Sequence, residues 1–218
     1  LLYGIAMIYG ATGSLDLSII ATVVGQGVAN PTILLIGIGL IIVGLGFKSA
    51  AFPFHQWAPD VYHGSPTVIT GFMSTAGKAA ALLAFIIIAR PLLPLSIASL
   101  EHSYNPAVVQ NIIAIMSAMT MLVGNITALA QKNVKRMLAY SSVAHAGYLL
   151  MGIVANSTMG WTGILFYTTA YLFMQIGAFI IVSIIEKDSE TNLQIEDYAG
   201  LSKSHPLLEA LMALFMIS

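Results

Sequence analysis

From Met137 to Ile185 the sequence contains no Asp, Glu, Lys or Arg, and this stretch limits the possible folds more than any other feature. It is long enough for two membrane-crossing helices of about 20 apolar residues each, with a polar turn at residues 156–158 between them. A helix satisfies its own backbone hydrogen bonds in lipid, where water offers no alternative partner. The stretch therefore predicts an all-α membrane protein with several spans.

The composition of the whole chain agrees with this prediction. Hydrophobic residues make up 58% of it and charged residues only 8%, against about 25% charged residues in an average globular protein. The formal net charge is −1, so no basic surface for nucleic acid is expected. The sequence contains no cysteine, which excludes disulfides, thiol nucleophiles and cysteine-ligated clusters within it.

We expect about six to seven transmembrane helices, which form a single transmembrane domain over residues 1–218. The expected ranges are 1–10, 32–51, 66–89, 107–130, 133–155, 160–185 and a last one from residue 206 onward. We expect a break near Pro53 after the second range, and an end to the third at Arg90 and Pro91, because proline disrupts helices. The first and last ranges begin or stop within apolar sequence, so we expect the chain to be the central fragment of a longer subunit.

Basic residues indicate the orientation in the membrane. Alternate loops lie on the same side of the membrane. The loops on one side contain five basic residues, which are Lys132, Lys135, Arg136, Lys187 and Lys203, whereas the loops on the opposite side contain only Arg90. The positive-inside rule then places loops 54–65, 131–136 and 186–205 on the cytoplasmic or matrix side. The longest of them, 186–205, is interpreted as a solvated connecting loop.

Lys78 is the clearest functional candidate. It lies about 18 Å along the third range at a rise of ~1.5 Å per residue, which is close to the bilayer midplane. A lysine there costs about 2.5–3.5 kcal/mol on insertion scales, so such residues are usually functional. The alternative is a structural ion pair with a carboxylate elsewhere in the assembly. A buried amine whose charge depends on its neighbours suits proton transfer, and we expect Lys78 to carry a proton.

Lys48 and His145 are weaker candidates on the residues alone. Lys48 follows a glycine-rich run and precedes Pro53, as ion sites on broken transporter helices do, but it could equally extend its side chain to the cytoplasmic interface. His145 lies midway along its range on the same helix face as Ser142 and Tyr148. A lone buried histidine is often only a packing residue, whereas a polar stripe around it favours a hydrated interior and proton transfer.

Three segments resemble the antiporter-like membrane subunits of respiratory complex I. They are FKSAAFPFHQWAPDVYHGSPT at 47–67, STAGKAA at 74–80 and NVKRMLAYSSVAHAGY at 133–148. The resemblance covers nearly the whole chain and implies a fold of inverted five-helix repeats with a broken helix near Pro53. It also implies that Lys48, Lys78 and His145 take part in proton translocation. The glutamate that partners the Lys48 position and a later lysine of the family have no counterpart in this sequence.

The resemblance implies a proton-translocating membrane-arm subunit of an NADH-quinone oxidoreductase, driven by redox chemistry in other subunits. It implies no cofactor in this chain, neighbouring antiporter-like subunits as partners, and a bacterial inner membrane or an organellar membrane as location. Two related alternatives are a monovalent cation/proton antiporter subunit of the Mrp type and a membrane subunit of a related hydrogenase. A further alternative is an inert scaffold for the membrane arm, which would have no reason to retain a costly midplane lysine.

Overall fold

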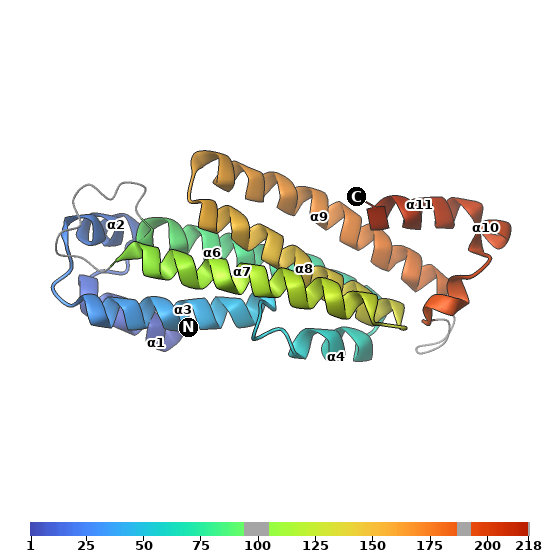
Figure 1. Cartoon of the computed structure of the whole chain (residues 1–218), viewed down its shortest axis with the longest axis horizontal. Coiled ribbons are helices and arrows are strands. Elements are labelled where there is room, and N and C mark those ends of the chain that lie inside the picture. Colours follow the sequence, from blue (N-terminus) through green and yellow to red (C-terminus); the bar gives the residue numbers. More distant parts are fainter. Residues whose placement is uncertain (94–104, 187–192, 218) are drawn as a thin grey trace.

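The computed structural model describes residues 1–93, 105–186 and 193–217, and within them the chain is almost entirely helical with no named strand. Five helical segments are long and apolar enough to cross a membrane, or six if the bent pair at the start is one span. Figure 1 shows the long helices running side by side along the long axis of the molecule. The predicted all-α membrane architecture is confirmed.

The first three helices form one side of the bundle. Helices α1 (Leu2–Thr12) and α2 (Leu17–Gln26) make a pair bent by 54°, and α3 (Pro31–Ser49) packs along α1. The sequence analysis gave no helix at α2. Its start carries a local signal, because the Asp16 carboxylate accepts hydrogen bonds from the backbone N–H groups of Ser18 and Ile19 and caps the helix.

The chain is broken near Pro53, as predicted. Helix α3 ends at Ser49, and α4 (Trp57–Gly64) follows as a separate short helix inside the predicted loop 54–65. The freed backbone groups find partners: the Trp57 indole Nε1–H donates to the Phe47 carbonyl at 2.9 Å, and the Phe52 N–H donates to the Thr120 hydroxyl at 2.9 Å. A membrane protein needs such partners wherever a helix is interrupted.

The third predicted span is one continuous segment built from three pieces. They are α5 (Thr67–Phe72), a π-helix (Met73–Gly77) and α6 (Lys78–Leu92). The prediction that Arg90 and Pro91 end this helix was wrong, because both lie inside α6. Proline ends a helix only when its ring clashes with the turn before it and when the lost hydrogen bond matters. Here the helix stops one residue later, so little backbone bonding is lost.

Three long helices complete the bundle: α7 (Pro106–Leu129), α8 (Val134–Ala155) and α9 (Thr158–Ile185). Each begins at a capping side chain, which belongs to Asn105, Asn133 and Ser157 in turn, so their starts follow from the sequence. Helix α8 packs against α7, α9 and α4 and is the most buried of the candidate spans, at 56% against 28% for α7. Helix α8 therefore lies at the centre of the bundle, where buried polar side chains of neighbouring helices contact it.

Short helices follow α9 in the described part of the connector. A 3₁₀-helix (Ile195–Tyr198), α10 (Leu201–Ser204) and the apolar α11 (Pro206–Ile217) follow it, and α11 packs against α9. Residues 187–192 of the predicted loop 186–205, including Lys187, lie outside the described residues. Leu193 and Ile195 pair with the segment before α8, through Val134 N–H to Leu193 O at 2.8 Å and Ile195 N–H to Lys132 O at 2.8 Å.

Candidate proton-transfer site

Lys78 is enclosed in the bundle at the first residue after the π-helix. Its side chain is 2% exposed. The Nζ donates to the Ser142 hydroxyl on α8 at 2.6 Å and lies 5.9 Å from the centroid of the Tyr62 ring. Tyr62 is itself fully buried, and its hydroxyl has no hydrogen-bond partner among the described residues. Lys78 therefore points into the protein, as its midplane position predicted, and its contacts are polar but uncharged.

A stripe of hydroxyl groups leads along the same helix to Lys78. Thr67, Thr70, Ser74 and Thr75 are each at most 4% exposed, and we refer to them as the hydroxyl stripe. Thr67, Thr70 and Ser74 follow one another at intervals of three and four residues, so they share one face of the segment. Thr75 lies next to Ser74. The Tyr171 hydroxyl from α9 joins this face by donating to the Ser74 carbonyl at 3.0 Å. The stripe places polar groups along about 12 Å of an otherwise apolar helix.

His145 lies on α8 within a cluster of three tyrosines. Its Nδ1 is 2.6 Å from the Tyr167 hydroxyl, and its ring centroid lies 5.0 Å from that of Tyr171 and 5.6 Å from that of Tyr148. The cluster borders a cavity of about 310 Å³ whose polar lining residues include Asn125, Ser141 and Gln175. A polar cavity of this volume is large enough to hold several water molecules.

The structure brings Lys78 and His145 into one connected group. Ser142, which binds the Lys78 ammonium group, lies three residues before His145 and so on the same face of α8. Tyr171 contacts both halves, because its hydroxyl bonds Ser74 and its ring packs on His145. Hydroxyl and imidazole groups both donate and accept hydrogen bonds. The group therefore places side chains of the kind that relay protons between Lys78 and the polar cavity.

Lys48 does not belong to this group. It lies in the last turn of α3 with its side chain exposed. Its ammonium group makes no hydrogen bond or ion pair within the described ranges 1–93, 105–186 and 193–217. A cation at the C-terminal end of a helix is favoured by the helix dipole. The structure thus places Lys48 at the break near Pro53, as the sequence predicted. Its side chain lies exposed on the outer surface of the described part of the protein.

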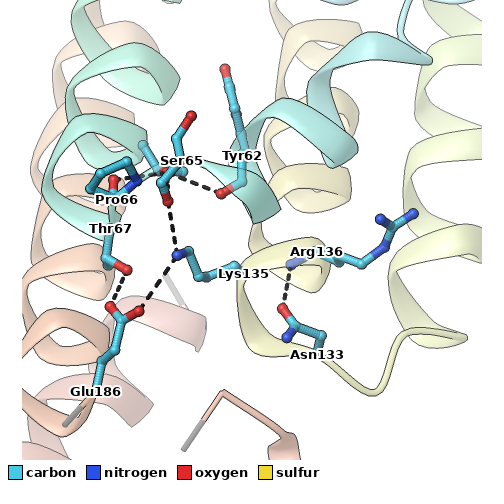
Figure 2. Close-up of polar contacts among 9 residues, drawn as sticks. Tyr62, Ser65, Pro66, Thr67, Asn133, Lys135, Arg136 and Glu186 are labelled. Carbon is cyan, nitrogen blue, oxygen red and sulfur yellow. Dashed lines mark hydrogen bonds and ion pairs between the residues drawn. The ribbon is translucent and has the colours of Figure 1, made fainter. Parts of the chain in front are cut away.

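The structure also reveals a buried ion pair that sequence reasoning missed. The Lys135 side chain is only 1% exposed, and its Nζ lies 3.7 Å from a Glu186 carboxylate oxygen and donates to the Ser65 carbonyl at 3.0 Å. Thr67 donates its hydroxyl to the same carboxylate (Figure 2). In the sequence, Lys135 stands between Lys132 and Arg136 and looks like any loop charge. Burial of one member of such a run is not visible before its distant partner is known.

The ion pair next to Lys135 is exposed to solvent, as expected for charged residues in a loop. Arg136 forms an ion pair with Asp60 at 2.7 Å, and the two side chains are 31% and 74% exposed. An exposed pair of this kind contributes about 0–1 kcal/mol.

Among the described residues, no group of three or more His, Asp or Glu side chains could hold a metal ion. The site is therefore built from lysine, histidine, tyrosine and hydroxyl groups.

Comparison with known proteins assigns this architecture to a family. The sequence model of the NADH:quinone oxidoreductase/Mrp antiporter transmembrane family matches residues 1–218. The chain belongs to this family. Among its curated relatives, NADH-quinone oxidoreductase subunit N of Trichlorobacter lovleyi is 47% identical and subunit N 1 of Chloroherpeton thalassium is 46% identical, each over 100% of this chain. The chain spans 43% and 44% of the length of these two relatives.

Solved structures of family members share the fold. A chain of respiratory complex I from Thermus thermophilus is 38% identical with a TM-score of 0.77, and 99% of this chain and 43% of that one are covered. A chain of an archaeal membrane-bound sulfane sulfur reductase is 30% identical with a TM-score of 0.84, covering 100% of this chain and 42% of that one. A chain of the Mrp complex from Dietzia, 23% identical over 99% of this chain and 38% of that one, has a TM-score of 0.78 and supports the fold alone.

Proposed function

We propose that this chain is part of a proton-translocating subunit in the membrane arm of a bacterial NADH-quinone oxidoreductase. Its partners would be the other membrane-arm subunits, its location the bacterial inner membrane, and its energy source redox chemistry in other subunits. The relatives named as subunit N support this proposal. The observation that carries it is the burial of Lys78, whose ammonium group is hydrogen-bonded to Ser142 one helical turn from His145.

The contacts suggest how a proton would move. In a low-dielectric interior, a charge placed near an amine strongly changes how firmly that amine holds its proton. Lys78 would hold a proton while charged and release it when a neighbouring positive charge approaches. Ser142, Tyr171 and His145 then offer successive acceptors toward the polar cavity. Lys48, at the break after α3, is proposed to supply one of the charges that bias Lys78.

Replacing Lys78 tests the proposal. In the complete enzyme, Lys78→Ala should lower proton pumping by about tenfold or more, because a positioned proton carrier typically contributes 10²–10⁴-fold. The measurement is NADH-driven acidification of inverted membrane vesicles, together with the amount of assembled complex. Lys203→Ala removes an exposed lysine and serves as the matched control. Normal pumping by an assembled Lys78→Ala enzyme would reject the proposed function.

A transport assay without NADH or quinone separates this function from its main rival. A monovalent cation/proton antiporter would bind its cation through acidic groups in the membrane. Glu209, which falls in the last expected range from residue 206 onward, is exposed in the first turn of α11. Proton exchange that depends on Na⁺ and proceeds in vesicles without NADH or quinone would favour the antiporter.

A further inference from the structure

The Lys135–Glu186 pair occupies the end of the hydroxyl stripe opposite Lys78. Glu186 accepts a hydrogen bond from Thr67, the first member of the stripe. The Ser65 carbonyl accepts both from Lys135 and, at 3.4 Å, from Thr70, which also donates to the Tyr62 carbonyl at 3.0 Å. Tyr62 in turn places its ring beside the Lys78 ammonium group. Polar contacts therefore connect the ion pair with the surroundings of Lys78.

Glu186 lies at one end of the bundle, where its side chain is partly exposed. It caps the C-terminal end of α9 and is 11% exposed, whereas its partner Lys135 is 1% exposed. Lys132 and Arg136, which lie at the same end of the bundle, mark it as the cytoplasmic side under the positive-inside rule. Figure 2 shows Glu186 at one edge of the cluster, with Thr67 and Lys135 between it and the Tyr62 ring. The carboxylate thus lies between bulk water and the buried stripe.

Stability alone gives a weak reason for this pair. Removing two charges from water costs several kcal/mol per ion, and apolar residues of similar size in place of a buried pair are often as stable or more stable. A carboxylate differs from such residues in that it can bind and release a proton. The Lys135 ammonium group and the Thr67 hydroxyl hold this carboxylate in place beside the hydroxyl stripe.

The nearby Tyr198 hydroxyl does not compete with Glu186 for this proton. Burial, together with the charges of Glu186 and Asp197, raises the pKa of Tyr198 to about 12. Tyr198 therefore stays protonated and neutral at cytoplasmic pH, and it does not accept a proton arriving from water. Leu193 and Ile195, which pair with the segment before α8, hold the 3₁₀-helix with Tyr198 over this end of the bundle.

We propose that Glu186 is the proton-uptake group for Lys78 and that Lys135 is the residue that positions it. A proton from the cytoplasmic side binds the Glu186 carboxylate and then leaves it for water and the hydroxyl stripe leading to Lys78. No bond other than those to the moving proton is made or broken. This inference rests on the proposed function, because it assumes that Lys78 receives a translocated proton.

The test compares matched carboxylate variants in the complete enzyme. Glu186→Gln keeps the size of the side chain but cannot carry the proton, whereas Asp60→Asn removes an exposed carboxylate at the same end of the bundle. The readout is the number of protons pumped per NADH oxidised, which a merely structural defect would leave unchanged in the complexes that assemble. We expect Glu186→Gln to lower this ratio by roughly tenfold, Glu186→Asp to restore part of it, and Asp60→Asn to leave it normal.

A double variant keeps the test decisive if Glu186→Gln does not assemble. Lys135→Met with Glu186→Leu replaces the pair by an apolar contact, which should hold the helices together without a protonatable group. We expect it to assemble with the same loss of pumping. A normal ratio in either Glu186 variant, measured beside a Lys78→Ala enzyme that has lost pumping, overturns this inference alone. Normal ratios in all of them overturn the proposed function as well.

Discussion

His145 is held by aromatic neighbours rather than by charges. Tyr148, Tyr167 and Tyr171 surround its ring, and Tyr167 fixes the Nδ1 side through a 2.6 Å hydrogen bond. Under the proposed function, the other ring nitrogen would exchange a proton with the polar cavity that His145 lines. An imidazole with one fixed and one free nitrogen is well suited to accept a proton on one side and release it on the other.

His145→Phe separates proton transfer from packing at this position. The phenyl ring keeps the shape needed among the tyrosines, so we expect normal assembly, but it removes both nitrogens. Pumping should fall by about tenfold or more, as measured by NADH-driven acidification of inverted vesicles. Tyr167→Phe, which removes the hydrogen bond and keeps the imidazole, should have a smaller effect. Unchanged pumping in His145→Phe would reduce this histidine to a packing residue.

The sequence indicated these residues to different degrees, for physical reasons. Lys78 and His145 stand out because each is a polar group within a long apolar run, where its cost demands a partner. Lys135 lies beside other charges and pairs with Glu186 far along the chain, so no local pattern marks it as buried. Tyr62 falls in the same class, because its contact with Lys78 depends on how α4 packs against the bundle.

At the scale of the helices, the close contact between α7 and α8 depends on glycine residues. A Cβ atom added to Gly124 would lie 2.6 Å from the backbone nitrogen of Ala144, and one added to Gly147 would lie 2.9 Å from the backbone nitrogen of Met121. Backbone atoms cannot move aside as a flexible side chain can. Small residues of this kind let membrane helices approach closely, and here they place the α8 polar face against the rest of the bundle.

Gly124→Leu should therefore push α7 and α8 apart. We expect a destabilisation of at least about 1–3 kcal/mol, the typical cost of overpacking, seen as a lower melting temperature and less assembled complex on native gels. Gly163→Leu is the matched control, because a Cβ at Gly163 meets nothing within 4 Å. Equal stability of the two variants would contradict the close approach.

Long helices were predictable from the sequence, and interruptions were predictable only in part. Helices α7, α8 and α9 begin at capping residues and fill apolar runs, so both ends follow from local chemistry. Helix α4 was assigned to a loop because it is short and carries Pro59 near its start, where proline is tolerated. The π-helix at Met73–Gly77, which contacts α9, follows from no residue pattern in the sequence.

At the scale of the molecule, the two ends of the bundle differ in chemistry. The ion pairs Lys135–Glu186 and Arg136–Asp60 lie at the end where α8 starts, while its other end carries the turn at Asn156 and Ser157. Long apolar helices with exposed apolar faces fit a multi-pass membrane protein. The orientation of the two ends relative to the cytoplasm remains a prediction from the loop charges.

Single cysteines can determine this orientation, because the sequence contains no cysteine of its own. Lys132 and Thr158 are exposed residues at opposite ends of α8. A membrane-impermeant maleimide should label Lys132→Cys only in inverted vesicles and Thr158→Cys only in intact spheroplasts. The reverse pattern would mean that Glu186 faces the outside of the cell, and proton release rather than uptake would then occur there.

The π-helix before Lys78 makes the length of this segment as important as its composition. A π-turn accommodates one residue more than an α-turn, so everything after it is rotated by about 100° relative to an uninterrupted α-helix. Loss of a single codon between Met73 and Gly77 would restore regular winding and swing Lys78 toward a different neighbour, without altering any side chain in the group it now contacts. Insertions and deletions here are consequently more damaging than most exchanges of one amino acid for another.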